Sequence, residues 1–244
     1  MEVGTGTSAN PTGASAVDDT TPGVERLLAL SDGVVAIALT LLVLQLVVPP
    51  IAGVSRTDAR SWHYLWKQLS TTGGDQFTAY VISFYVIAQF WLTHHRVFRS
   101  IEGHVEGLAW WNFGFLFTIT LMPFTSDLLG RFGQNPLAID IFAFNLVLAS
   151  AATQGVRLFA QSHHLQSADV TERDVRMGYF RSLWLLVVVC LAATVAWYDT
   201  GLAVYCWLLI IPSNHLAKAF VNRFPGRPGS DDQPAAPAVN KEIG

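Results

Sequence analysis

The sequence predicts an all-α membrane protein with six transmembrane helices and both termini in the cytoplasm. Three observations support this fold class: the composition, six long apolar stretches, and an uneven distribution of Lys and Arg. Of the 244 residues, 51% are hydrophobic and only 14% are charged, and the mean hydropathy is +0.37. A soluble domain carries roughly a quarter charged residues to cover its surface. The composition is therefore typical of lipid-facing helices.

Six apolar stretches approach the roughly 20 residues that a helix needs to cross a bilayer. They are Leu28–Val48, Phe77–Val97, Leu108–Leu129, Ala138–Phe159, Ser182–Tyr198 and Leu202–Asn222. Pro123 and Pro212 lie inside the third and sixth stretches and are expected to kink those helices. We therefore predict a transmembrane domain over residues 24–224, with disordered tails at 1–23 and 225–244.

Lys and Arg indicate the orientation of these helices. With six crossings, one side holds both termini and the second-to-third and fourth-to-fifth connections. Eleven cationic residues fall on that side: Arg26, Arg96, Arg99, Arg157, Arg173, Arg176, Arg181, Lys218, Arg223, Arg227 and Lys241. Four fall on the other: Arg56, Arg60, Lys67 and Arg131. The positive-inside rule then places both termini in the cytoplasm of a plasma or inner cell membrane.

The connection Pro49–Asp75 is polar but contains three aromatic residues, Trp62, Tyr64 and Trp66. Aromatic rings of this kind gather where the membrane meets water. We expect this connection to lie at the membrane interface.

The first apolar stretch carries an ionisable residue, Asp32, about one turn inside the membrane. A charged group at that depth is costly unless it is paired. At 100° per residue, Ile37, Leu41 and Leu44 share a stripe about 60° wide, and Asp32 points about 140° away from Ile37. Asp32 is thus predicted to face a neighbouring helix. By periodicity alone, the apolar stripe is most simply interpreted as ordinary helix packing or lipid contact.

The second stretch ends at the same predicted cytoplasmic depth as Asp32, with two histidines, His94 and His95. Carboxylate, guanidinium, hydroxyl and imidazole groups can satisfy one another through charge-assisted hydrogen bonds. We predict a polar clamp between the first two helices that joins Asp32, Arg26 and Ser31 to these histidines. The alternative is that both histidines are loop residues in contact with water.

Several segments resemble the prokaryotic members of the transmembrane protein 175 family. They are Arg26-x-x-x-Leu30-Ser31-Asp32-Gly33, Ala79-Tyr80-Val81-Ile82-Ser83-Phe84, Trp91-x-x-His94-His95-Arg96 and Leu121-Met122-Pro123-Phe124. The similarity runs from Arg26 to about Leu129. The family motif has an aromatic residue before Ser-Asp, and here that position is Leu30.

This resemblance implies a potassium-selective channel made of four six-helix subunits, in which the first helix lines a central pore. The rings of aliphatic side chains that would form the constriction are Ile37, Leu41 and Leu44, with Thr40 beside them. The resemblance also adds Trp91 to the clamp that holds the pore helix. It implies no enzymatic activity, no bound metal and no cofactor other than the permeant K⁺, and it implies other copies of the chain and membrane lipids as partners.

The physical chemistry of apolar rings is compatible with a potassium-selective constriction. The sequence contains no Thr-Val-Gly-Tyr-Gly segment, so a filter of backbone carbonyls is not indicated. Apolar constrictions gate by dewetting and make an ion shed or squeeze its water. Strongly hydrated ions are penalised more, so K⁺ is expected to pass more easily than Na⁺.

Two other functions, a metal-dependent enzyme and a transporter, are alternatives to a channel. Paired histidines at His94-His95 and His163-His164 are compatible with a metal-dependent membrane enzyme, although such sites need more ligands than these. A proton-coupled transporter would use Asp32 and the histidines as a proton relay, although the two halves of the chain show no convincing repeat. The net charge of −3 gives no indication of nucleic acid as a partner.

The remaining polar residues of the helices have simpler explanations. Asn112, Asn145 and Gln154 are expected to form hydrogen bonds between helices. Asp127 and Arg131, on the outer side, either pair across a helical turn or attract cations to the channel mouth, and the sequence does not decide between these.

Overall fold

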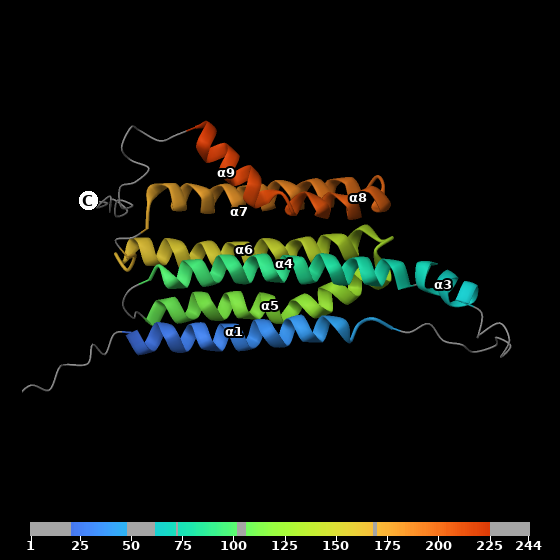
Figure 1. Ribbon diagram of the computed structural model, residues 1–244, viewed down its shortest axis with the longest axis horizontal. Coiled ribbons are helices and arrows are strands. Elements are labelled where there is room, and N and C mark those ends of the chain that lie inside the picture. The colour runs from blue at the N-terminus through green and yellow to red at the C-terminus, as the bar shows by residue number, and fades with distance from the viewer. Residues whose placement is uncertain (1–20, 48–61, 72, 102–105, 168–169, 225–244) are drawn as a thin grey trace, which may run out of the picture.

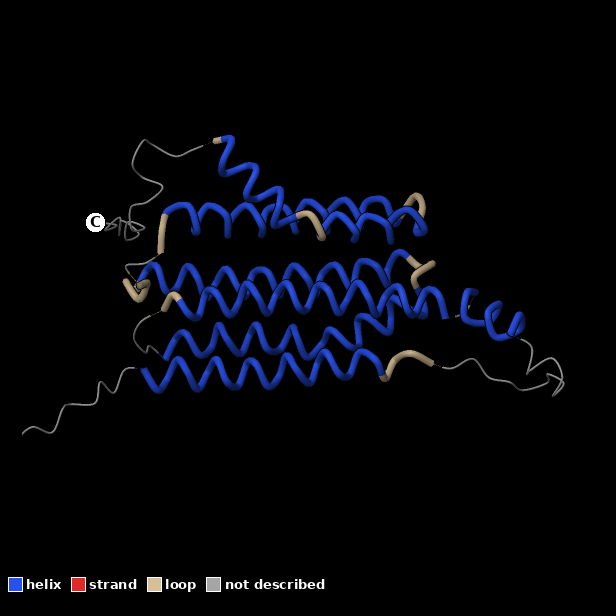
Figure 2. The backbone as a smooth tube through the Cα atoms, viewed as in Figure 1, coloured by secondary structure: helices blue, strands red, loops and turns tan. Residues whose placement is uncertain are grey.

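The computed structural model describes residues 21–47, 62–71, 73–101, 106–167 and 170–224, which form helices joined by short connections (Figures 1 and 2). The helices are α1 (Thr21–Val43), α3 (Trp62–Thr71), α4 (Gly73–Arg99), α5 (Glu106–Phe132), α6 (Pro136–Ser162), α7 (Glu172–Ala196), α8 (Thr200–Cys206), the 3₁₀ helix η1 (Trp207–Ile210) and α9 (Ser213–Arg223). No strand longer than an isolated bridge lies in this described part of the chain. The prediction of an all-α fold is confirmed.

The long helices run side by side in an elongated bundle with α1 at one edge (Figure 1). Helix α1 contacts α4 and α5, α5 contacts α6, and α6 contacts α7, which in turn carries α8 and α9. A continuous apolar core follows this order, with Leu42, Ile119, Phe142 and Trp207 among its fully or almost fully buried members. Among the described residues, helix α1 therefore packs against the bundle on the side that faces α4 and α5.

Capping residues fix where two of these helices begin. Asn135 precedes Pro136, and its side chain accepts a hydrogen bond from the backbone N–H of Leu137 at 3.0 Å. Thr171 and Asp174 form a capping box at the start of α7, in which each side chain accepts from the other residue's backbone N–H.

Four helices, α1, α5, α6 and α7, are long and apolar enough to cross a membrane. Helix α4 is 27 residues long and occupies the second predicted span, but polar residues such as Gln89, His94 and His95 lower its hydropathy. The sixth predicted span is broken into α8, η1 and α9, with a bend of 62°. The chain is thus a multi-pass membrane protein with four clear spans, or five if the bent pair crosses as one.

The two prolines have different effects. Pro212 separates η1 from α9 at the 62° bend, so the kink predicted there is confirmed. Pro123 lies inside a helix that remains continuous, although the later part of α5 changes direction (Figure 2). A proline removes one backbone donor and crowds the preceding turn, which bends a helix without always ending it.

The described residues include the end of one predicted connection and the end of the predicted N-terminal tail. Helix α3 occupies the end of the Pro49–Asp75 connection, with Trp62 69% and Trp66 68% exposed. Helix α1 begins at Thr21, so the last three residues of the predicted N-terminal tail are helical. The rest of that tail, and the predicted tail at 225–244, lie outside the described residues.

Candidate pore helix and its polar contacts

One face of α1 packs against the rest of the bundle. Its buried residues recur every three or four positions, which places them on one side of the helix. They are Val24, Ser31, Val35, Ala38 and Leu42. They meet the parts of α4 and α5 that form the main core and a smaller cluster near Phe98 and Leu108.

The opposite face of α1 is largely exposed among the residues that the structure describes. Ile37 is 60% exposed, Leu41 43% and Leu44 75%. Thr40 is exposed beside them, and its hydroxyl donates to the Ile37 carbonyl of its own helix at 2.8 Å. A Cβ atom at Gly33 would meet nothing within 4 Å. The structure therefore brings the four predicted pore residues onto one open, mostly apolar face.

Asp32 lies on the flank between these two faces and bonds to α4. The indole Nε1–H of Trp91 donates to Asp32 Oδ1 at 2.7 Å. The ring of Trp91 stacks on that of His95, with centroids 5.3 Å apart. Asp32 thus faces a neighbouring helix, and its hydrogen-bond partner there is the indole.

Ser31 takes part in a second, fully buried contact. Its hydroxyl lies 3.1 Å from Asn112 Oδ1 on α5 and 2.8 Å from the Leu27 carbonyl. His94 Nε2 lies 2.8 Å from the same Asn112 oxygen. Because that oxygen can only accept, His94 donates through Nε2. The His94 ring is held between Phe98 and Phe115, with centroid distances of 4.3 Å to each.

The predicted clamp is therefore divided into two contacts. Asp32 pairs with Trp91, and Ser31 and His94 meet through Asn112. Arg26 is exposed and forms no hydrogen bond or ion pair with another described residue, and His95 joins only through its ring. The sequence indicated Asn112 as an interhelical hydrogen-bonding residue but not as the group that joins Ser31 to His94. The sequence places Asn112 on the third predicted span but does not show which residues of the first two spans lie beside it.

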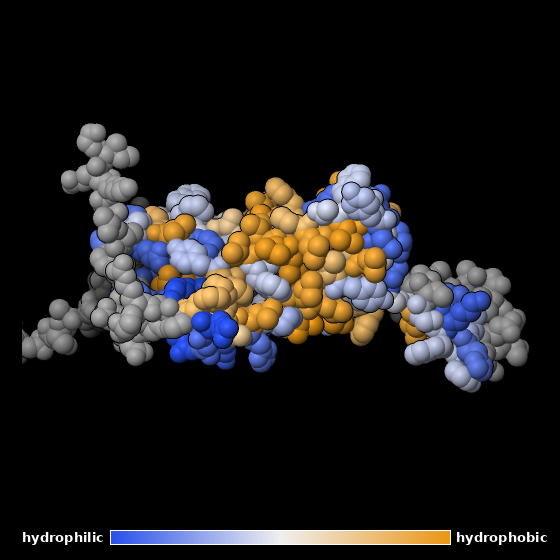
Figure 3. Space-filling view, turned by 90° about the horizontal axis from the view of Figure 1, so that it is seen from above, coloured by the Kyte–Doolittle hydropathy of each residue, from blue (hydrophilic) through white to orange (hydrophobic). Residues whose placement is uncertain are grey.

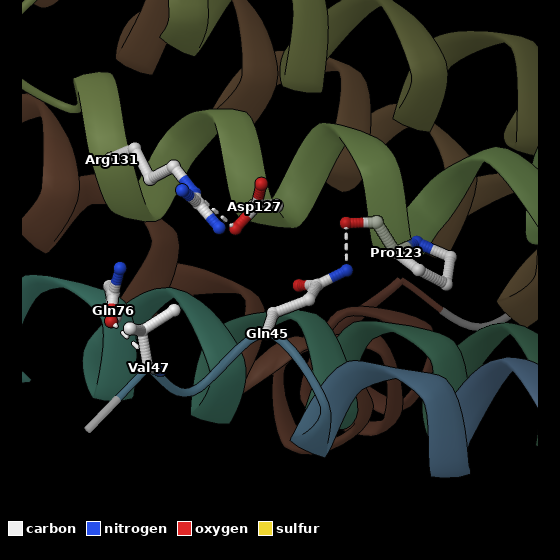
Figure 4. Close-up of polar contacts among 6 residues, drawn as sticks. All are labelled: Gln45, Val47, Gln76, Pro123, Asp127 and Arg131. Carbon is white, nitrogen blue, oxygen red and sulfur yellow. Dashed lines mark hydrogen bonds and ion pairs between the residues drawn. The ribbon is translucent and has the colours of Figure 1, made fainter.

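The residues that follow the C-terminal end of α1 are also attached to α4 and α5 (Figure 4). The Gln45 side chain donates to the backbone carbonyl of Pro123, and the backbone N–H of Val47 donates to Gln76 Oε1 at 3.3 Å. Asp127 and Arg131 pair across one turn of α5 at 2.7 Å. The first of the two interpretations of this pair, a local ion pair, is the one that the geometry supports.

Two other buried polar contacts join the helices. Ser83 of α4 donates to Ser126 of α5 at 2.8 Å, and Asn145 of α6 donates to the Thr118 carbonyl at 3.1 Å. The interhelical role predicted for Asn145 is confirmed. Gln154 has a buried oxygen without a partner among the described residues.

The histidines do not assemble a metal centre within the described part of the chain. No group of three or more His, Cys, Asp or Glu side chains there is placed to hold a metal ion. His163 and His164 are exposed at the end of α6, whereas His94 is buried.

Comparison with known proteins places this arrangement in a family. The model of the endosomal/lysosomal potassium channel TMEM175 family matches residues 26–123. A potassium channel of Chamaesiphon minutus is 31% identical over 188 residues, which cover 68% of this chain and 88% of that one. A potassium channel of Chryseobacterium is 33% identical over 129 residues, or 52% of this chain and 59% of the relative. The zebrafish relative, Danio rerio TMEM175, is named a proton channel and is 26% identical over 180 residues, which cover 72% of this chain but only 33% of that protein.

The fold agrees with these sequence matches. The crystal structure of a TMEM175 homologue from Chamaesiphon minutus superposes with a TM-score of 0.66 at 23% identity, covering 80% of this chain and 97% of that chain. The family match takes in α1, α4 and the first part of α5, which carry the exposed stripe and both polar contacts. These relatives are ion channels and not enzymes, as the sequence led us to expect. The chain belongs to the TMEM175 family.

Proposed function

We propose that this protein is a subunit of a potassium-selective channel in a cell membrane, with α1 lining a central pore in a homotetramer. The observation that carries the proposal is the open apolar face of α1, opposite the face that packs on α4 and α5. The choice of K⁺ as the permeant ion is supported by the bacterial relatives that are named potassium channels.

One helix face cannot enclose a pore, so symmetry has to supply the other walls. Helix α1 lies at an edge of the bundle, where copies can meet around a shared axis (Figure 1). Ile37, Leu41 and Leu44 are spaced along about 10 Å of helix, and in four copies they form stacked aliphatic rings. Such rings admit an ion only as its hydration shell is stripped or deformed, which favours K⁺ over the more strongly hydrated Na⁺.

The polar contacts orient the rings. Asp32–Trp91 and Ser31–Asn112–His94 fix the rotation of α1 about its axis, and the stripe points away from both. Through these contacts the clamp residues act on the pore without lining it. Gly33 and Ala36 beside the stripe leave room for another copy of the helix to approach.

We further propose that six segments cross the membrane and that both termini are cytoplasmic. Helix α4 is long enough to cross, at about 1.5 Å per residue, and the bent α8–η1–α9 segment supplies the sixth crossing. The N-terminal end of α1, the C-terminal ends of α4 and α6 and the start of α7 lie at one end of the bundle (Figure 1). Arg96, Arg157 and Arg181 belong to that end, in keeping with the positive-inside rule.

The test is electrical recording of the reconstituted full-length protein under bi-ionic K⁺ and Na⁺. We expect Leu41→Ala to enlarge the constriction and shift the reversal potential toward lower K⁺ preference. The matched control is Val43→Ala, which truncates a side chain that is 48% exposed but lies off the stripe. Unchanged reversal potentials for alanine variants at all three rings would exclude α1 as the selective element.

The same recordings distinguish the other functions. A pH gradient imposed without K⁺ tests proton conduction, which the vertebrate relatives' name suggests. Potassium movement coupled in fixed ratio to protons would instead indicate a transporter, and mass photometry of the purified protein measures the number of subunits.

A further inference from the structure

A cationic cavity of about 670 Å³ lies at the end of the bundle where α4 and α6 finish and α7 begins. Its walls come from α4, α6, α7, α9 and the connection between α6 and α7. Five of its lining side chains are cationic: Arg96, Arg99, Arg157, Arg181 and Lys218. Asp174 is the one carboxylate among the described lining residues. Figure 3 shows hydrophilic residues gathered at this end of the bundle, next to a broad hydrophobic surface.

The cationic side chains that line the cavity outnumber the one described carboxylate there. Arg157 Nη1 and Arg181 Nε are buried and have no hydrogen-bond partner among the described residues. The Asp174 carboxylate is engaged in its capping box, where Oδ2 accepts from the Thr171 hydroxyl at 2.7 Å. Arg181 is repelled by Arg96 and Arg157 and attracted by Asp174. Partly buried cations that repel one another are costly to hold together, so an anion bound among them would stabilise the cluster.

The position of Arg157 is built into the packing of α7. A Cβ atom on Gly178 would overlap the Arg157 guanidinium, so the glycine leaves the space that this side chain occupies between the two helices. The Arg157 Cζ atom lies 6.0 Å from the centroid of the Tyr179 ring, within range of a cation–π contact. The fold thus holds this charge against the wall of the cavity.

The connections beside the cavity are tied together as well. Ile101, after α4, forms an isolated antiparallel bridge with Gln166, after α6. The backbone N–H of Ser167 donates to the Ser100 carbonyl at 2.9 Å. Gln166, Ser167 and Ser100 all line the cavity, so its rim is formed by hydrogen-bonded backbone.

We propose that this cavity binds a phosphate-bearing anion. Guanidinium groups present paired N–H donors that match phosphate oxygens, and these bonds are among the strongest in proteins. The volume lies within the range of about 300–1,000 Å³ that is usual for small-ligand sites. Basic pockets between transmembrane helices take phospholipid head groups, and a soluble phosphate ester presents the same chemistry. This inference does not depend on the proposed pore.

The experiment measures thermal unfolding of the full-length protein in a neutral detergent, with either pyrophosphate or short-chain phosphatidic acid added. We expect at least one probe to stabilise the wild type in a saturable way. Arg157→Gln and Arg181→Gln should each weaken that binding by roughly tenfold or more, since hydrogen bonds to charged groups contribute about 1.5–3 kcal/mol. Without a probe, neither variant should be less stable than the wild type, because each removes a partly buried charge that is repelled by its cationic neighbours.

Two further variants separate a defined site from general charge attraction. Arg173→Gln removes a charge from the same end of α7 but outside the lining, where Arg173 bonds Asn222 at 2.7 Å, and it should bind like the wild type. Gly178→Ala keeps every charge but displaces Arg157, and it should bind more weakly.

Each outcome bears on the proposal. Stabilisation by phosphatidic acid alone identifies a lipid head group, and stabilisation by pyrophosphate identifies a soluble anion. The proposal is overturned if neither probe stabilises the wild type, or if Arg173→Gln loses as much binding as the two cavity variants. If Gly178→Ala does not fold, the two glutamine variants and the Arg173→Gln control still show whether the anion binds in this cavity.

Discussion

Leu41 and Leu42 are neighbours in the chain, yet Leu41 is 43% exposed and Leu42 is completely buried. The 100° turn between successive residues sends one side chain to the core and the other to the open face of α1. Two adjacent leucines therefore have different structural roles. Leu42 contributes to the stability of one chain, whereas Leu41 leaves much of its surface exposed there and is available for contacts in an assembly.

The polar residues of α1 are divided between the same buried and exposed faces. Ser31 is buried and bonds Asn112, whereas Thr40 is exposed and bonds only its own helix. Helix α1 thus combines a face that resembles the interior of a folded domain with a face that the described residues leave largely exposed. The two faces are expected to respond to mutation in opposite ways.

The largest difference in stability is expected between the two leucines. Leu42→Ala should lower the free energy of unfolding by about 3 kcal/mol, because it opens a cavity in the core. Leu41→Ala should change it by less than about 0.5 kcal/mol. Reversible unfolding of both variants in the same detergent measures the difference. Equal losses of stability would contradict the two-faced description of α1.

A smaller effect is expected at the buried polar contact. Asn112→Leu keeps the volume but leaves His94 Nε2 buried without a partner, which should cost about 2 kcal/mol. Ser31→Ala is the control, since the Ser31 hydroxyl also bonds the Leu27 carbonyl and its loss leaves Asn112 paired with His94. If Ser31→Ala proves as harmful as Asn112→Leu, the amide is not the centre of this contact.

The smallest effect is expected at the partly exposed contact. Trp91→Phe removes the indole donor to Asp32 and should cost about 1 kcal/mol, because water can partly replace the lost bond. If Asp32 sets the rotation of α1, this variant should also alter single-channel conductance. A variant with normal conductance and wild-type stability would remove the Asp32–Trp91 contact from the mechanism.

The all-α fold and the existence of the long helices follow from hydropathy, which reports burial in protein or lipid equally well. For that reason hydropathy could not separate Leu41 from Leu42. The stripe through Ile37 and Leu44 was visible from helical periodicity, but the pore function proposed for it came from the family resemblance.

The details that the sequence did not supply depend on how helices pack. Asn112 lies 18 residues beyond His94 on another helix, and no periodicity relates two helices to each other. The same applies to Arg157 and Gly178, whose close approach depends on the packing of α6 on α7. The break at Pro212 was predictable because it is a local property of the backbone, whereas the 62° angle is set by packing against α7.

Contacts at the middle and at the C-terminal end of α1 restrict how any passage along it could widen. Trp91 and Asn112 hold the middle, at Asp32 and Ser31, and Gln76 and the Pro123 carbonyl hold the residues that follow the helix, through the same two neighbours, α4 and α5. A rigid rotation of α1 would break both sets of bonds at once. Dilation is expected instead from flexing of the stretch between these anchors, where Gly33 and the backbone-bonded hydroxyl of Thr40 make the helix easiest to bend.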